Sequence, residues 1–148
     1  MKRMLLTAVA LLTTPLIALA QASPAGLWKT IDDDGKTEKS LVRISEQAGV
    51  LTGRIEQLLA PDAKRDGVCD LCSDERRNQP LLGLTILRQV RHSSDDAGLW
   101  EGGDILDPKN GKTYKVRLRP IDNGKRLEVR GYIGMPLLGR TQTWTRVE

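Results

Sequence analysis

The chain has 148 residues, a length that suits a single domain. Aromatic residues make up 3% of it, Phe is absent, and the formal net charge is +4. So few rings for stacking on bases, together with so mild a charge, argue against a nucleic-acid-binding protein, and no nucleic-acid partner is expected.

The first 20 residues have the composition of a secretory signal peptide. A basic head containing Lys2 and Arg3 precedes an apolar run over residues 5–19, and Ala18-Leu19-Ala20 supplies a small-residue cleavage site. The run is short for a membrane span. We therefore predict that residues 1–20 are removed, and that residues 21–148 form one periplasmic or secreted domain without a transmembrane segment. Cleavage lowers Lys+Arg from 23 to 21 against 19 Asp+Glu, so the net charge falls from +4 to +2.

The mature chain consists of short alternating runs separated by turn residues, as is typical of an all-β domain. In the run 112–119, for example, Tyr114, Val116 and Leu118 share one face and basic residues occupy the other. Eight strands are predicted, near 26–32, 37–45, 49–59, 84–92, 98–106, 112–119, 125–133 and 140–147. Consecutive hairpin signals such as Asn123-Gly124 favour an antiparallel up-and-down barrel of about eight strands over a sandwich. Such a barrel leaves no free edge and can hold a small ligand.

One long connection, residues 60–82, interrupts the strands and contains both cysteines. Its length predicts either a mobile lid or a short helix that caps the domain, and the run 56–60 before it could also be helical. Cys69 and Cys72 favour a local disulfide in an oxidising compartment. A redox-active pair and half of a zinc site are the alternatives. Nearby Asp66, Asp70 and Asp74 disfavour a reactive thiolate.

Two short strings of residues each occur twice. Ala-Gly-Leu-Trp stands at 25–28 and 97–100, and Pro-Leu-Leu-Gly at 80–83 and 136–139. The offsets of 72 and 56 residues disagree, so a simple tandem duplication is rejected. We interpret the glycines as sites of close backbone approach and the tryptophans as plugs at the barrel ends, with an arginine of the last strand over an indole ring. The residues assigned to this packing are Gly26, Trp28, Trp100, Trp144, Arg140 and Arg146.

Three blocks of sequence resemble a family of small exported bacterial proteins, the domain of unknown function 2147. The first block is residues 80–87, the second is residues 100–108 with 111–114, and the third is residues 130–134 with 138–146. Gly26-Leu27-Trp28 and the closing Arg146 resemble the corresponding residues of lipocalin-type (calycin) barrels. The resemblance covers essentially the whole mature chain. It implies a lipocalin-like barrel of eight strands in the cell envelope, with a cysteine pair before the Pro-Leu-Leu-Gly block. It implies no established reaction.

No catalytic or metal-binding constellation is recognisable. The three adjacent acids Asp32-Asp33-Asp34 favour a solvated hairpin tip over a calcium loop, because calcium loops alternate their acidic positions. His92, the single histidine, is predicted to sit in water at the end of a strand. Motifs of nucleophilic hydrolases, zinc proteases and phosphate loops are missing from the sequence. We therefore expect no enzyme, no metal and no cofactor.

Two apolar stretches fall where polar turns are normal. They contain Leu81, Leu82, Ile133, Met135, Leu137 and Leu138. These segments either fold over the barrel end as core, or form the mouth of a ligand site or an interface with a second copy. The leading hypothesis is a binding protein for a small apolar or amphipathic molecule, with Arg140 placed to orient an acidic headgroup. The alternatives are an envelope interaction module that docks on a protein or on peptidoglycan, a homodimer interface, and a thiol redox protein.

Overall fold

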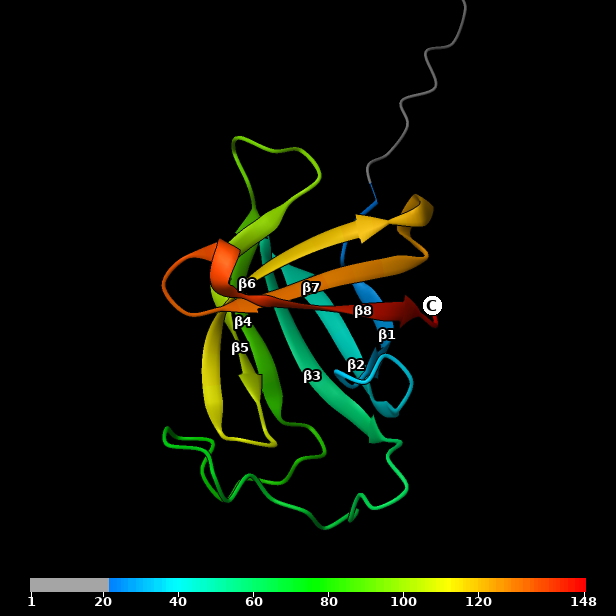
Figure 1. Cartoon of the computed structure of the whole chain (residues 1–148), viewed down its shortest axis with the longest axis vertical. Coiled ribbons are helices and arrows are strands. Elements are labelled where there is room, and N and C mark those ends of the chain that lie inside the picture. The colour runs from blue at the N-terminus through cyan, green and yellow to red at the C-terminus, as the bar shows by residue number, and fades with distance from the viewer. Residues whose placement is uncertain (1–21) are drawn as a thin grey trace, which may run out of the picture.

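The eight strands pair in sequence order and close into one barrel (Figure 1). The computed structural model describes residues 22–148, so the predicted signal peptide lies outside the described residues. The strands are β1 (Gly26–Ile31), β2 (Glu38–Gln47), β3 (Val50–Leu58), β4 (Thr85–His92), β5 (Trp100–Asp107), β6 (Lys112–Ile121), β7 (Arg126–Tyr132) and β8 (Arg140–Arg146). The predicted all-β, antiparallel, up-and-down barrel is confirmed.

Closure depends on pairing between the first and the last strand. Trp28 and Lys29 of β1 lie opposite Arg146 and Thr145 of β8, and every other strand pairs with its neighbour in sequence. Along each strand, every second side chain then points into the barrel. Val116 and Leu118 of β6 do so, and both are fully buried. Among the described residues, no helix is long and apolar enough to cross a membrane.

Turn chemistry sets where the strands end. β2 continues two residues further than we predicted, to Gln47, and β3 begins one residue later, at Val50, with these two residues paired. Ala48 (φ 51°) and Gly49 (φ 77°) both adopt left-handed backbone, which is the two-residue turn whose twist matches a hairpin. The run 56–60 is not helical, because β3 continues as far as Leu58.

The two repeated strings mark opposite ends of the barrel. Successive strands alternate in direction, so β1 and β5 start at one end, and β4 and β8 start at the other. Ala-Gly-Leu-Trp precedes or opens β1 and β5, while Pro-Leu-Leu-Gly precedes β4 and β8. We call the first end the base and the second end the mouth. Each string thus recurs where the chain enters a strand at one particular end of the barrel.

The connection between β3 and β4 contains no helix, so the predicted capping helix is wrong. The connection packs instead as an irregular segment along the mouth end of the barrel, the green trace at the bottom of Figure 1. A bridge pairs Val68 with Pro80, and the carbonyl of Leu71 lies so close to Gly111 of the β5–β6 turn that no Cβ would fit there. Backbone and side-chain contacts of this kind replace a helix in satisfying the segment's polar groups.

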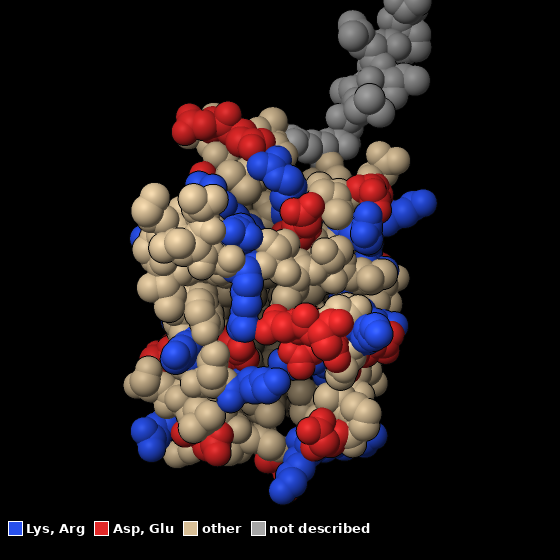
Figure 2. Space-filling view, in the orientation of Figure 1, with Lys and Arg blue, Asp and Glu red and all other residues tan. Residues whose placement is uncertain are grey.

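The β7–β8 loop projects into solvent and is not core. It contains a short 3-10 helix, η2 (Pro136–Leu138), and the exposed fractions of Leu137 and Leu138 are 81% and 76%. Ile133 and Met135 are also exposed. Figure 2 shows an uncharged projection on the left, where Figure 1 draws this loop. The interpretation that this loop folds over the barrel end as core is therefore wrong.

Candidate functional site

The barrel contains a cavity of about 500 Å³ that opens at the mouth. Six inward-facing residues of five strands form an apolar wall, which consists of Ile55, Leu58, Ile86, Ile105, Val129 and Trp144. Part of the space exists because Gly131 of β7 also faces the interior: a Cβ placed there would meet no side-chain atom closer than 3.5 Å. The cavity volume falls in the range typical of small-molecule sites.

Charged side chains surround the mouth in pairs. Arg140 Nη1 donates to Asp33 Oδ2 (2.6 Å), and Arg140 Nη2 donates to Asp107 Oδ2 (3.2 Å). Lys39 and Lys109 lie 3.9 and 3.7 Å from carboxylate oxygens of Asp32. The pKa of Asp32 lies below its usual value mainly because its carboxylate accepts the backbone N–H of Asp33, and the two lysines lower this pKa further.

The sequence did not single out Asp33 as part of this site. It grouped Asp33 with Asp34 at a solvated hairpin tip, and the two carboxylates in fact have different roles. Asp34 closes the turn by accepting the backbone N–H groups of Lys36 and Thr37 (both 2.8 Å), and the Thr37 hydroxyl holds its pKa at about 2. Asp33 reaches back across the mouth to β8. The contact spans 107 residues of chain, so no local pattern could have revealed it.

The base is closed by Trp28, Arg146 and Gly26. Trp28 is fully buried, and Nε1 donates to the carbonyl of Pro24 (2.7 Å). The Arg146 guanidinium lies over the indole ring, and burial lowers the pKa of this guanidinium. A Cβ on Gly26 would collide with Arg146 Nη1, and the φ of 142° also favours glycine there. Gly-x-Trp and the closing arginine therefore form one packed unit.

The remaining residues assigned to barrel ends occupy three different places. Trp100 is buried at the base, where its ring centroid lies 4.7 Å from that of the exposed His92. Trp144 faces the cavity and is buried, and Arg140 stands at the mouth on the same face of β8. Arg140 and Arg146 thus mark opposite ends of the barrel, although sequence spacing placed them on one face and grouped them together.

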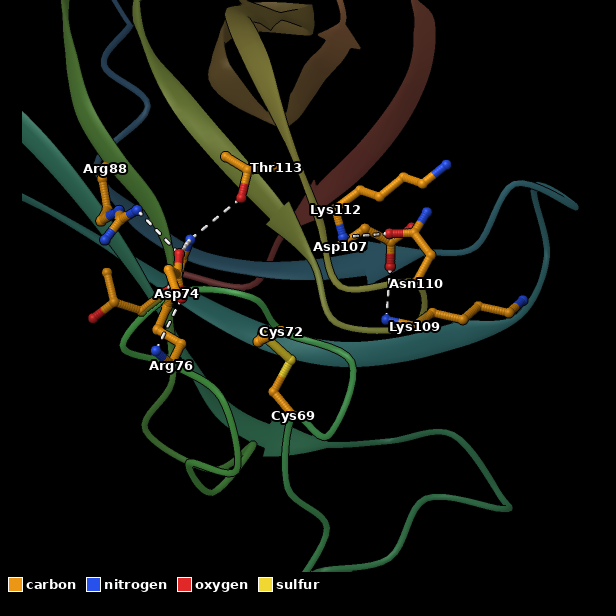
Figure 3. The surroundings of a disulfide bond; sticks show 11 residues. Cys69, Cys72, Asp74, Arg76, Arg88, Asp107, Lys109, Asn110, Lys112 and Thr113 are labelled. Carbon is orange, nitrogen blue, oxygen red and sulfur yellow. Dashed lines mark hydrogen bonds and ion pairs between the residues drawn. A yellow bond between two sulfur atoms is a disulfide. The ribbon is translucent and has the colours of Figure 1, made fainter.

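Cys69 and Cys72 form a disulfide, and both residues are buried (Figure 3). Close by, Arg76 is only 5% exposed and connects the β3–β4 segment to the barrel. Its Nη2 donates to Asp74 Oδ2 (2.6 Å) and its Nη1 to the carbonyl of Thr85 (2.9 Å). These contacts fix the segment beside the mouth, and the side-chain hydrogen bond from Arg76 lowers the pKa of Asp74 to about 2.

The six apolar residues assigned to a rim do not form one surface. Leu81 lines the cavity, whereas Leu82 lies in a separate depression formed by the β3–β4 segment and β4. Ile133, Met135, Leu137 and Leu138 belong to the β7–β8 loop and do not line the cavity. The guanidinium of Arg130 holds this loop against the barrel by donating to the carbonyl of Pro136 (2.7 Å).

Comparison with known families agrees with this architecture. Residues 26–146, from the start of β1 to the end of β8, match the model of a family described as an uncharacterized protein conserved in bacteria, DUF2147. The chain belongs to this family. The resemblance found in the sequence is thereby confirmed, and the family's matched region coincides with the barrel. A search of the curated proteins found no match.

A solved structure shares the fold. It is protein HP1028 from the human pathogen Helicobacter pylori, which its title says belongs to the lipocalin family. The two chains superpose with a TM-score of 0.71 and are 23% identical, and the match covers 86% of this chain and 85% of that chain. This similarity shows that the DUF2147 barrel described here is lipocalin-like.

Proposed function

We propose that this protein is an exported, lipocalin-like binding protein of the cell envelope that holds a small apolar or amphipathic molecule inside its barrel. The observation that carries the proposal is the cavity of about 500 Å³, which has an apolar wall and one open end. A ligand that moves its apolar surface from water into such a site gains about 25 cal/mol for each Å² buried.

Other features support export and binding without catalysis. The signal peptide expected over residues 1–20 and the Cys69–Cys72 disulfide both suit an oxidising compartment outside the cytoplasm. His92 stands away from the cavity, with Nε2 2.7 Å from the carbonyl oxygen of Ala97. The proposal therefore assigns the barrel a carrier or sensor role in which the ligand is held and released unchanged.

The cavity can be narrowed by a single substitution. Gly131 faces the interior without a left-handed φ, so Gly131→Leu would place an apolar side chain in the cavity without backbone strain. Thr143 lies on the outer, exposed face of the neighbouring strand, and Thr143→Leu is the matched control. We expect the wild type to bind the neutral fluorescent probe N-phenyl-1-naphthylamine. Gly131→Leu should weaken this binding roughly tenfold or more, and Thr143→Leu should leave it unchanged.

Native mass spectrometry of protein purified from its own envelope supplies the second test. A bound species that is present in the wild type and lost in Gly131→Leu would support binding inside the barrel. Equal probe affinity of the wild type and Gly131→Leu would place any bound probe outside the cavity and overturn the proposal.

A second candidate function is an interaction module that docks on another envelope protein. The observation that favours it is the exposed apolar β7–β8 loop, where Leu137 and Leu138 project most strongly. Photo-crosslinking from a probe at position 135 in cells should then give one discrete band, and the double substitution Leu137→Ser and Leu138→Ser should abolish it. A crosslinking pattern that this double substitution leaves unchanged would remove the candidate.

A further inference from the structure

We infer that the cavity takes an amphiphile with a carboxylate headgroup, and that the Asp33 carboxylate occupies the headgroup position until the ligand displaces it. The inference rests on the proposed binding function and adds the chemical class of the ligand and the way in which the mouth opens.

Asp33 is held as a bound carboxylate would be. Arg140 Nη1 donates to Oδ2 (2.6 Å), and Gln142 Nε2 donates to Oδ1 (2.7 Å). Arg140 and Gln142 are two residues apart on β8, so both side chains project from the same, inward face of the strand. Each carboxylate oxygen has its own donor, and one of the two donors is a guanidinium. This arrangement is suited to recognising a carboxylate.

The two donors remain in position without Asp33. Trp144 Nε1 donates to Gln142 Oε1 (3.2 Å), which turns the amide so that its N–H groups face the mouth. Arg140 keeps its contact with Asp107 (3.2 Å), and its guanidinium carbon lies 5.8 Å from the centroid of the Tyr114 ring. The receptor is therefore built into β8 and its neighbours, and the hairpin that carries Asp33 is not needed to hold it in place.

The hairpin can release Asp33 at little cost. The side chains of Asp33 and Arg140 are 47% and 53% exposed, and ion pairs so open to solvent contribute little to stability. The β1–β2 turn does not need Asp33, because Asp34 closes it through Lys36 and Thr37. The incoming carboxylate would replace one charged contact of Arg140 by another, while the hairpin swings away intact.

Two other carboxylates at the mouth, those of Asp107 and Asp32, are already engaged, which disfavours a cationic headgroup beside Arg140. Asp107 Oδ1 accepts the backbone N–H of Lys109 (2.9 Å), and Asp32 Oδ1 accepts that of Asp33 (2.8 Å). Asp32 also lies near two lysines. Below the β8 donors the wall is apolar, beginning with Trp144 and Val129. A ligand whose carboxylate binds Arg140 thus places its apolar body along the wall of the cavity.

The test compares a fluorescent fatty acid, cis-parinaric acid, with its uncharged methyl ester. We expect the wild type to bind the acid about threefold more tightly than the ester, because the contact with Arg140 is open to solvent and replaces that of Asp33. Arg140→Gln should abolish this preference by weakening only the acid. Lys112→Gln is the matched control: it removes one positive charge at the mouth end, from a residue that does not line the cavity, and should keep the preference.

A second pair of variants tests the displacement of Asp33. Asp33→Asn should strengthen binding of the acid severalfold and leave the ester unchanged, because the competing carboxylate is gone. Asp62 also lines the mouth, so Asp62→Asn makes the same change in net charge and is the control. In the wild type the acid, but not the ester, should increase amide hydrogen exchange in the hairpin residues 32–37, since the hairpin loses its tie to β8.

The outcomes separate this inference from the proposed function. Equal binding of acid and ester by the wild type, an unchanged preference in Arg140→Gln, or equal effects of Asp33→Asn and Asp62→Asn would each overturn the carboxylate site while leaving apolar binding in the barrel. Failure of the wild type to bind the acid, the ester and N-phenyl-1-naphthylamine would overturn the binding function itself. Circular dichroism and melting curves establish that each variant is folded.

Discussion

The guanidinium carbon of Arg146 lies 4.2 Å from the centroid of the Trp28 ring. The same guanidinium donates to the carbonyl oxygens of Gly124 (2.5 Å), Ala25 (2.8 Å) and Ser23 (2.7 Å). It thereby joins the last strand, the β6–β7 turn and the segment before β1 over one buried ring. This arrangement closes the base, so the proposed ligand would enter the cavity from the mouth.

Trp28→Ala is expected to lower the free energy of unfolding by about 3–5 kcal/mol, the range found for large core truncations. The change removes a fully buried ring and leaves the Arg146 guanidinium without its stacking partner. Urea unfolding followed by circular dichroism measures the loss, and Trp28→Phe, which keeps a ring, should lose less. A loss below about 1 kcal/mol for Trp28→Ala would show that the ring does not plug the base.

Arg146→Lys is expected to cost about 1–3 kcal/mol, because an ammonium group cannot replace a planar fork that reaches three carbonyls and covers a ring. Arg126→Lys is the control, since Arg126 is exposed and pairs with the exposed Asp122. Chemical denaturation of both variants provides the comparison. Equal losses in the two would contradict a special role of the base arginine.

Asp74 should make the protein lose stability in acid. Its pKa lies at about 2 in the folded protein, mainly because Arg76 donates to the carboxylate, and the usual value is 3.8. A lowered pKa contributes stability that is complete above pH 3.8 and disappears as the pH falls toward 2. Urea unfolding between pH 6 and pH 2 should therefore show a smaller loss for Asp74→Asn than for the wild type. An equal loss of stability in the wild type and Asp74→Asn would contradict the link between the lowered pKa of Asp74 and stability in acid.

Removal of the disulfide should cost about 2 kcal/mol, because the chain-entropy model assigns little to so short a loop. We expect this loss for the pair Cys69→Ala and Cys72→Ala, measured by chemical unfolding. Both cysteines are buried, so dithiothreitol should reduce the bond slowly in native buffer and rapidly in urea. Rapid reduction in native buffer would instead favour the thiol redox function.

The pair Leu137→Ser and Leu138→Ser should leave the melting temperature nearly unchanged, because both side chains are exposed and lose little buried surface. The same pair should reduce self-association, since an exposed apolar loop is the kind of surface through which copies of a chain associate. Analytical ultracentrifugation over a range of concentrations measures this effect. A large drop in melting temperature would mean that the loop packs as core.

Much of the fold could be predicted because its signals are local. Alternation of apolar and polar residues identifies strands, and Asn123-Gly124 or Ala48-Gly49 requires a tight turn whatever the rest of the chain does. Eight strands with hairpin turns then leave a closed barrel as the economical arrangement. The cysteine spacing predicted the disulfide in the same local way, and the family blocks identified DUF2147.

The candidate site was predicted only in part. Arg140 was expected near a mouth, but its partner Asp33 was assigned to a solvated turn, and Gln142 had no assigned role in the site. These residues meet because β1 and β8 pair when the barrel closes, and the contacts join residues more than a hundred positions apart. Periodicity shows which side chains point inward, but it does not show which of them meet across the mouth.

By itself, the sequence determined the strands, the turns, the disulfide pair and the family, because each depends on neighbours along the chain. Only the tertiary structure decided that the interior stays open and that Arg146 and Arg140 serve opposite ends. It also decided that the β7–β8 loop faces solvent. The physical reason is that the cavity volume equals the space enclosed by the closed sheet minus the volume of all side chains that point inward, and Gly131 adds no side chain to that volume. That difference depends on every strand at once.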